Sequence, residues 1–134
     1  MSAPAIRTKR IYAPPDRSDG TRVLVMRLWP RGIRKDRTDV WLKELGPVKP
    51  LLRDFLDKRI RWETYVTRYL AGLERTAAQA QVDEVLGYAR RGAVTLLCGC
   101  ADENRCHRTL LQAYLTTLAR ASASNATDAH ERLQ

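Results

Sequence analysis

The residues best suited to chemistry in this sequence lie close together in its C-terminal third. Three cysteines and a histidine fall within one short segment, residues 98–108, with the sequence CGCADENRCHR. A thiol next to a histidine or a positive charge can become a reactive thiolate. We therefore take Cys98, Cys106 and His107 as the candidate catalytic residues.

This segment lies between a predicted strand and a predicted helix. Residues 93–98 are almost wholly apolar, as in a strand buried on both faces, and apolar residues recur at helical spacing from Leu110 to Leu118. If Asp102 or Asn104 caps this helix, Cys106 lies in its first turn, near unpaired backbone N–H groups. The position predicts a lowered pKa for Cys106 and a place where an anion can bind.

Other interpretations of the same residues remain open. Cys98 can be a core residue, and His107 a hydrogen-bonded structural residue on the apolar face of the helix. A disulfide from Cys98 or Cys100 to Cys106 would make a redox switch. Four zinc ligands within so few residues are cramped, and the adjacent Cys106 and His107 are expected to point in different directions, so we predict no metal site and assign no cofactor.

A second loop follows the apolar strand predicted at residues 22–28 and has the sequence RLWPRG, from Arg27 to Gly32. A charge at the end of an apolar strand must be paired or face a cleft. We take Arg27, Trp29 and Arg31, with Arg108 from the first loop, as candidate ligand-binding residues, because guanidinium groups suit carboxylates and phosphates. The alternatives are a core position for Trp29 and an ion pair between Arg27 and an acid, for which we name Asp54, Glu63 and Glu84.

The elements between these loops predict an α/β fold. We expect an edge strand at 7–12, strands at 22–28 and 93–98, and helices at 41–45, 51–56, 62–73, 76–89 and 110–118. This order indicates a single three-layer α/β domain, residues 1–121, with a small, mostly parallel sheet flanked by helices. Residues 122–134 are expected to form a disordered tail. Parallel strands end at one edge of the sheet, where ligands usually bind, so both loops should meet there.

Composition favours anionic partners. The 134 residues include 24 Lys and Arg against 15 Asp and Glu, a formal charge of +9, which attracts phosphate-bearing molecules. The sequence has no run near the ~20 apolar residues that cross a bilayer and no secretory signal, so we expect a cytoplasmic protein with reduced thiols and no membrane contact. Nothing in the sequence indicates an oligomeric state.

With these motifs in view, the chain resembles the family catalogued as domain of unknown function 488 (DUF488), over roughly residues 9 to 118. The likeness rests on residues 9–12, the RLWPRG loop, residues 41–45, the helix from Trp62 to Tyr69, and Val94–Cys98 with Cys106-His-Arg108. It implies an α/β fold and leaves the activity open. Short members with the RLWPRG loop often lack the cysteines, and Cys100 is an addition to the wider family's pattern.

These observations give three functional hypotheses. The first is binding of an anionic, phosphate-bearing small ligand between the two loops, with possible thiol chemistry at the cysteines. The second is a nucleic-acid-binding module, based on the basic runs at residues 31–37 and 90–91. The third is a metal or redox site built on the cysteines.

Overall fold

The computed structural model describes residues 6–133, and describes side chains as far as residue 121. The strands are β1 (Ile6–Arg10), β2 (Thr21–Leu24), β3 (Val40–Trp41) and β4 (Val94–Cys98), and the helices are α1 (Lys49–Leu56), α2 (Trp62–Gly72), α3 (Thr76–Arg91) and α4 (His107–Leu133). The division at residue 121 into a domain and a disordered tail remains a prediction.

The strands form one four-stranded sheet in the order β1-β4-β2-β3, and every pairing is parallel. The central strand β4 pairs with both β1 and β2, so Ile6 and Thr21 lie opposite Val94 on its two sides. All four strands therefore end at the same edge. The predicted α/β class and parallel sheet are confirmed.

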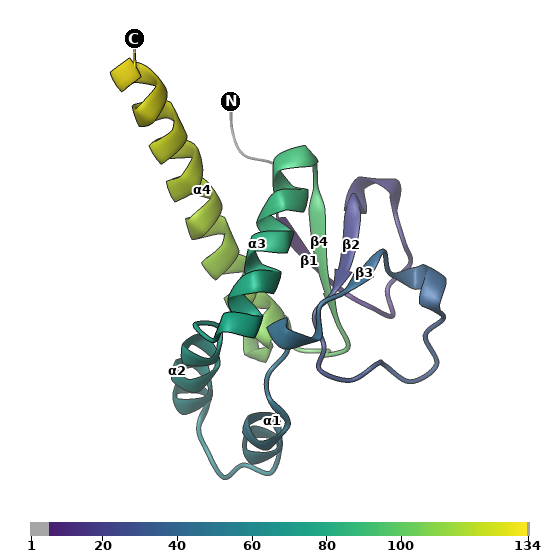
Figure 1. Ribbon diagram of the computed structural model, residues 1–134. Helices are drawn as coiled ribbons and strands as arrows, with labels where there is room; N and C mark the ends of the chain where they lie inside the picture. Colours follow the sequence, from purple (N-terminus) through teal and green to yellow (C-terminus); the bar gives the residue numbers. More distant parts are fainter. Residues whose placement is uncertain (1–5, 134) are drawn as a thin grey trace.

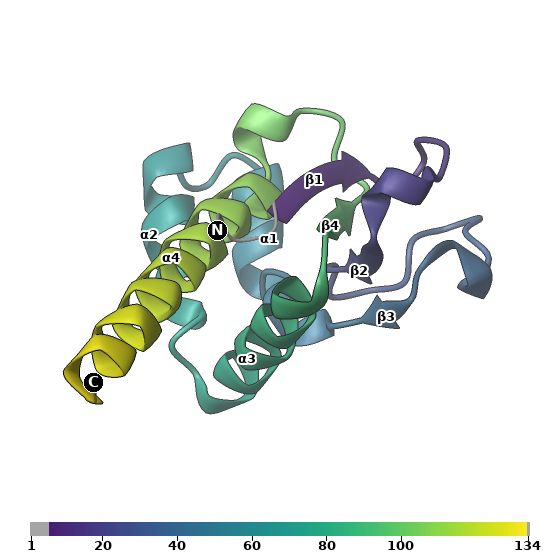
Figure 2. The ribbon, with the colours of Figure 1, turned by 90° about the horizontal axis from the view of Figure 1, so that it is seen from above.

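The two faces of the sheet are covered differently. The four helices lie on one side, where they enclose the main core, and loops cover the other side (Figures 1 and 2). These loops connect β1 to β2 through residues 11–20 and β2 to β3 through residues 25–39, and a smaller cluster of Ile11, Leu24 and Leu97 lies beneath them. The layer on this second face consists of connections instead of helices.

Two of the expected elements are wrong in part. The segment 41–45, expected to be helical, contributes strand β3 and a 3-10 turn at Lys43–Leu45. The strand expected at 22–28 ends at Leu24, although the Val25 N–H still donates to the Leu97 carbonyl. Just beyond the end of β2 the backbone passes close to Gly46, where a Cβ would lie 2.5 Å from the Arg27 nitrogen, so this position requires glycine.

Candidate metal and thiol site

Cys98 reaches the helical side of the sheet because side chains alternate along a strand. Val94 and Leu96 face the helix-covered core, so Cys98, two residues further on, points the same way, toward the start of α4. Its side chain is buried. The strand thus ends by directing a thiol into the space between the sheet and α4.

A short turn precedes α4 and determines where its first residues lie. The Asp102 carboxylate accepts a hydrogen bond from the Asn104 N–H at 3.0 Å and caps a 3-10 turn at Glu103–Arg105. The expected cap at Asp102 is therefore present, but on this turn, and α4 itself begins at His107. Cys106 and His107 are buried at the junction, facing the end of β4.

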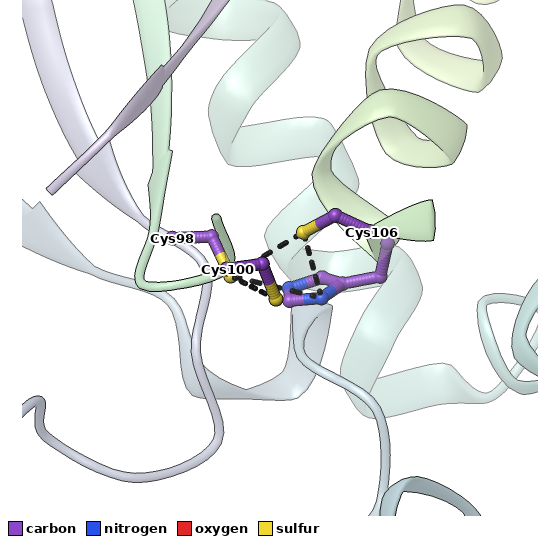
Figure 3. Close-up of side chains that lie close together, drawn as sticks. Cys98, Cys100 and Cys106 are labelled. Atoms are coloured by element: carbon purple, nitrogen blue, oxygen red, sulfur yellow. Dashed lines mark hydrogen bonds between the residues drawn. The ribbon is translucent and has the colours of Figure 1, made fainter. Parts of the chain in front are cut away.

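The three cysteines and His107 form a single cluster, which we call the Cys3His cluster. Cys98 Sγ lies 3.5 Å from Cys100 Sγ and 3.5 Å from Cys106 Sγ, and His107 Nδ1 lies 3.9 Å from Sγ of both Cys98 and Cys106. All four donor atoms lie within 4.8 Å of one another. Figure 3 shows the three thiols facing one another across the gap between strand end and helix start.

This geometry corrects one sequence-based expectation. The adjacent side chains of Cys106 and His107 do not point apart, because the chain turns from the 3-10 segment into α4 between them. All three cysteines are free thiols, and their 3.5 Å separations are contacts between unbonded sulfurs.

A backbone carbonyl fixes the tautomer of His107. Its Nε2 lies 2.5 Å from the Val25 carbonyl oxygen, which can only accept a hydrogen bond, so Nε2 carries the proton. Nδ1 therefore presents its lone pair to the sulfurs. Burial lowers the pKa of His107 and keeps the ring neutral, with the Val25 hydrogen bond acting in the opposite direction.

The pKa values of the three thiols are shifted in different directions. Hydrogen bonds from Cys106 and Cys98 lower the pKa of the Cys100 thiol, and the same interactions raise the pKa of Cys98 and of Cys106. The expectation of a lowered pKa for Cys106 is therefore wrong. Cys106 is buried and donates to Cys98 Sγ, whereas the half-buried Cys100 is the thiol whose pKa these interactions lower.

Arg27 is held by partners within the fold. Its Nη1 donates to Glu44 Oε2 at 2.9 Å and its Nη2 to the Gly46 carbonyl at 3.0 Å. The hydrogen bond from Arg27 also holds the pKa of Glu44 below its usual range. Arg27 thus forms an ion pair, as one of the two interpretations expected, but its partner is Glu44 and not one of the three acids named from the sequence.

The other two residues of the RLWPRG loop have separate surroundings. Trp29 packs edge-on against Trp41, with ring centroids 5.4 Å apart, and its Nε1–H donates to the Ile33 carbonyl at 2.8 Å. It belongs to the smaller core cluster. Arg31 is exposed, and its carbonyl accepts a hydrogen bond from the Tyr12 hydroxyl at 3.2 Å.

Arg108 is the candidate ligand-binding residue that lies beside the cysteines. Its side chain is buried, and Nη1 donates to the Cys100 carbonyl at 2.7 Å. Arg27 pairs with Glu44 and Arg108 donates to the Cys100 carbonyl, whereas Arg31 is exposed. Their convergence on one anion stays a prediction. The structure brings together the cysteines, His107 and Arg108.

Three contributors to the site were missed from the sequence. Cys100 was weighed only as a disulfide partner or a fourth zinc ligand and was left out of the candidate site residues, although it completes the cluster and lies two residues from Cys98. Glu44 was not considered as the partner of Arg27. The Val25 carbonyl carries no signal in the sequence, because any residue type supplies the same group.

No helix in the described part of the chain is long and apolar enough to cross a membrane.

These features define a class of protein: an α/β domain with a parallel sheet and a Cys3His cluster at the edge where the strands end. The chain belongs to the DUF488 family, because residues 6–119 match the family described as "Active DUF488-N3 subclade". The resemblance inferred from the motifs is confirmed.

The chain is also similar to bacterial proteins that are described as uncharacterized. It is 34% identical over 115 residues to the uncharacterized protein YeaO of Escherichia coli (strain K12), which covers 84% of this chain and 98% of that protein. It is 35% identical over 108 residues to the uncharacterized protein Rv3073c of Mycobacterium tuberculosis (strain ATCC 25618 / H37Rv), covering 79% and 89%. No solved structure matches the chain.

Proposed function

We propose that this protein is a zinc-binding member of its family and that the Cys3His cluster is the metal centre. The observation that carries the proposal is the convergence of three Sγ atoms and His107 Nδ1 within 4.8 Å of one another. Three thiolates and one imidazole form a common ligand set of structural zinc sites.

The separations within the cluster suit a tetrahedral ion. Zinc–sulfur bonds of about 2.3 Å and zinc–nitrogen bonds of about 2.0 Å put neighbouring donors roughly 3.5 to 3.8 Å apart in a tetrahedron. Two sulfur–sulfur separations of 3.5 Å and two sulfur–nitrogen separations of 3.9 Å are within a few tenths of an ångström of these values. The remaining pairs, from Cys100 to Cys106 and to His107, lie within 4.8 Å and would close around the ion.

The second layer of contacts supports the same assignment. A histidine that binds a metal through one nitrogen almost always donates its other N–H to a carbonyl or carboxylate, which orients the ring. His107 has this arrangement with the Val25 carbonyl. Four protein donors fill a tetrahedral zinc site, so the ion would connect the end of β4 to the start of α4 without an open position for substrate.

Metal analysis tests the proposal. The protein is purified without added zinc or chelator, and inductively coupled plasma mass spectrometry is expected to find one zinc ion per chain. Cobalt(II) in place of zinc should give the absorption of a tetrahedral site with thiolate ligands. The variants Cys98→Ser, Cys106→Ser and His107→Asn each remove one ligand. Each should weaken zinc binding by more than the roughly 10–100-fold that follows when a residue supporting a ligand is lost.

The chain supplies its own control, because it has two histidines. His130→Gln leaves the Cys3His cluster intact and should retain a full zinc content. Protein that folds with free thiols and takes up neither zinc nor cobalt would contradict the assignment.

A second candidate function is docking of an anionic small molecule or nucleic acid at the same edge of the sheet. The observation that favours it is a basic residue at the end of β4: Arg10 Nε donates to the Gly99 carbonyl. The Tyr12 ring also lies near Gly99, and its hydroxyl donates to the carbonyl of the exposed Arg31. Binding of inorganic phosphate or of a short single-stranded oligonucleotide, measured at increasing salt, tests this candidate. Affinity that falls steeply with salt supports it, and affinity independent of salt contradicts it.

A further inference from the structure

Arg108 is a buried cation without an acidic partner among the described residues. Its side chain is 4% exposed, and its only hydrogen bond there is from Nη1 to the Cys100 carbonyl. Nε is buried and lacks an acceptor. None of the ion pairs formed within residues 6–121 includes Arg108. A guanidinium group is always charged, so its burial is costly unless a negative charge lies nearby.

Two other arginines that lie largely inside the fold have such charges. Arg22 pairs with the carboxylate of Asp19, and Arg27 pairs with Glu44. Arg108 has instead the Cys3His cluster beside it, since it follows His107 directly and is bonded to the backbone of Cys100. The thiols are the groups at this position that can carry negative charge.

A metal-bound Cys3His cluster would supply the negative charge that Arg108 lacks. Three thiolates, a neutral histidine and a divalent ion sum to one net negative charge, which one guanidinium neutralises. We propose that Arg108 is the internal counter-ion of the metal-bound Cys3His cluster and so determines how tightly the cluster binds metal. This inference rests on the proposed zinc centre.

The proposal separates the charge of Arg108 from its hydrogen bond. Arg108→Gln retains an N–H donor on a shorter side chain and removes the charge, whereas Arg108→Lys retains both a donor and the charge. Arg105→Gln is the matched control, because Arg105 is an exposed arginine in the same loop and its charge is screened by solvent.

The experiment measures zinc(II) and copper(I) affinity of each purified full-length variant by competition with chromophoric chelators. Arg108→Gln is expected to bind zinc about 10–100-fold more weakly. A copper(I) cluster carries two net negative charges, so its attraction to the guanidinium is doubled, and the fold-loss for copper(I) should be roughly the square of that for zinc. Arg108→Lys should restore both affinities, and Arg105→Gln should change neither.

Each result has a defined meaning. Equal losses for the two metals in Arg108→Gln, or unchanged affinities, overturn the counter-ion role while leaving the zinc centre in place. Wild-type protein that binds neither metal overturns the zinc centre and this inference together. Circular dichroism shows whether Arg108→Gln folds; if it does not, Arg108→Lys decides, because a folded Lys variant that loses zinc affinity more than about tenfold contradicts a role based on charge.

Discussion

Asp19 is the carboxylate that balances buried positive charge on the loop-covered face of the sheet. It accepts hydrogen bonds from Lys9 Nζ at 3.2 Å and from Arg22 Nη1. Burial raises the pKa of Asp19, but hydrogen bonds from the Asp16 N–H, Lys9 and Arg22 outweigh it, and the pKa lies below its usual range. Asp19 therefore stabilises the fold in its charged form.

The sign of this shift gives a pH prediction. A carboxyl group with a depressed pKa in the folded state stabilises the protein above its unfolded pKa of about 4 and loses that contribution as the pH falls further. Asp19→Asn should lower the free energy of unfolding at pH 7 by about 3 kcal/mol, because it leaves Arg22 buried without its partner. The difference from wild type should shrink below about pH 4. Denaturant titrations at several pH values measure both effects.

Asp36→Asn is the control for this prediction. Its partner Arg34 is 84% exposed and Asp36 is 66% exposed, and such surface pairs contribute little. A comparable loss of stability in both variants would show that burial of the Asp19 pair is not the cause.

At the residue scale, the sequence predicted which side chains form the candidate site and missed the groups that hold them in place. The types and spacing of Cys98, Cys106 and His107 suggested chemistry at this place, because few residues other than cysteine and histidine supply soft donors. The hydrogen bond from His107 to Val25 joins residues far apart in the sequence and involves only a carbonyl. Such a contact depends on the tertiary fold, and no local pattern encodes it.

Helix α2 contacts the Cys3His cluster through Tyr69. The Tyr69 ring packs edge-on against the His107 imidazole, with centroids 5.6 Å apart. Its buried hydroxyl donates to the Leu45 carbonyl at 2.6 Å, which connects α2 to the 3-10 turn after β3. One side chain thus positions two other elements.

Removing this hydroxyl should destabilise the fold without removing the ring. Tyr69→Phe leaves the buried Leu45 carbonyl without that donor and is expected to lower the free energy of unfolding by about 1 to 2 kcal/mol. The ring still packs on His107, so zinc content should stay at the wild-type level. Urea denaturation and metal analysis of the same preparation check the two expectations; an unchanged unfolding midpoint would argue against the role of the hydroxyl.

At the element scale, the apolar pattern located helix α2 and strand β4 and failed for the two-residue strand β3 and for the full length of α4, which runs from His107 to Leu133. Helix α2 begins at Trp62 as its apolar spacing predicted, and β4 covers Val94–Cys98 within the expected strand. The two-residue strand β3 is too short to show alternation, and it forms because Val23 and Leu24 of β2 supply pairing partners. Its identity as a strand comes from the sheet and not from its own residues.

At the scale of the whole molecule, the proposed zinc ion should contribute to global stability. A ligand present at about 100 times its dissociation constant stabilises the folded state by about 2.7 kcal/mol. For a domain of this size, removing zinc with a chelator should lower the melting temperature by roughly 10 °C. Scanning calorimetry before and after chelation measures the shift, and Cys106→Ser should show none. A smaller shift is expected if the unfolded chain also binds zinc, since all four donors are close in sequence.

The strand order has a consequence for how the protein is made. β1 and β2 pair with β4 at its two long sides and, within the described chain, not with each other. During synthesis, most of the chain leaves the ribosome before the strand that joins them. Ile6 of β1, the apolar residues of β2 and the apolar faces of the helices that pack on the sheet therefore stay exposed until β4 is synthesised. Folding should then be late and cooperative, and nascent chains ending before residue 94 should depend most on chaperones.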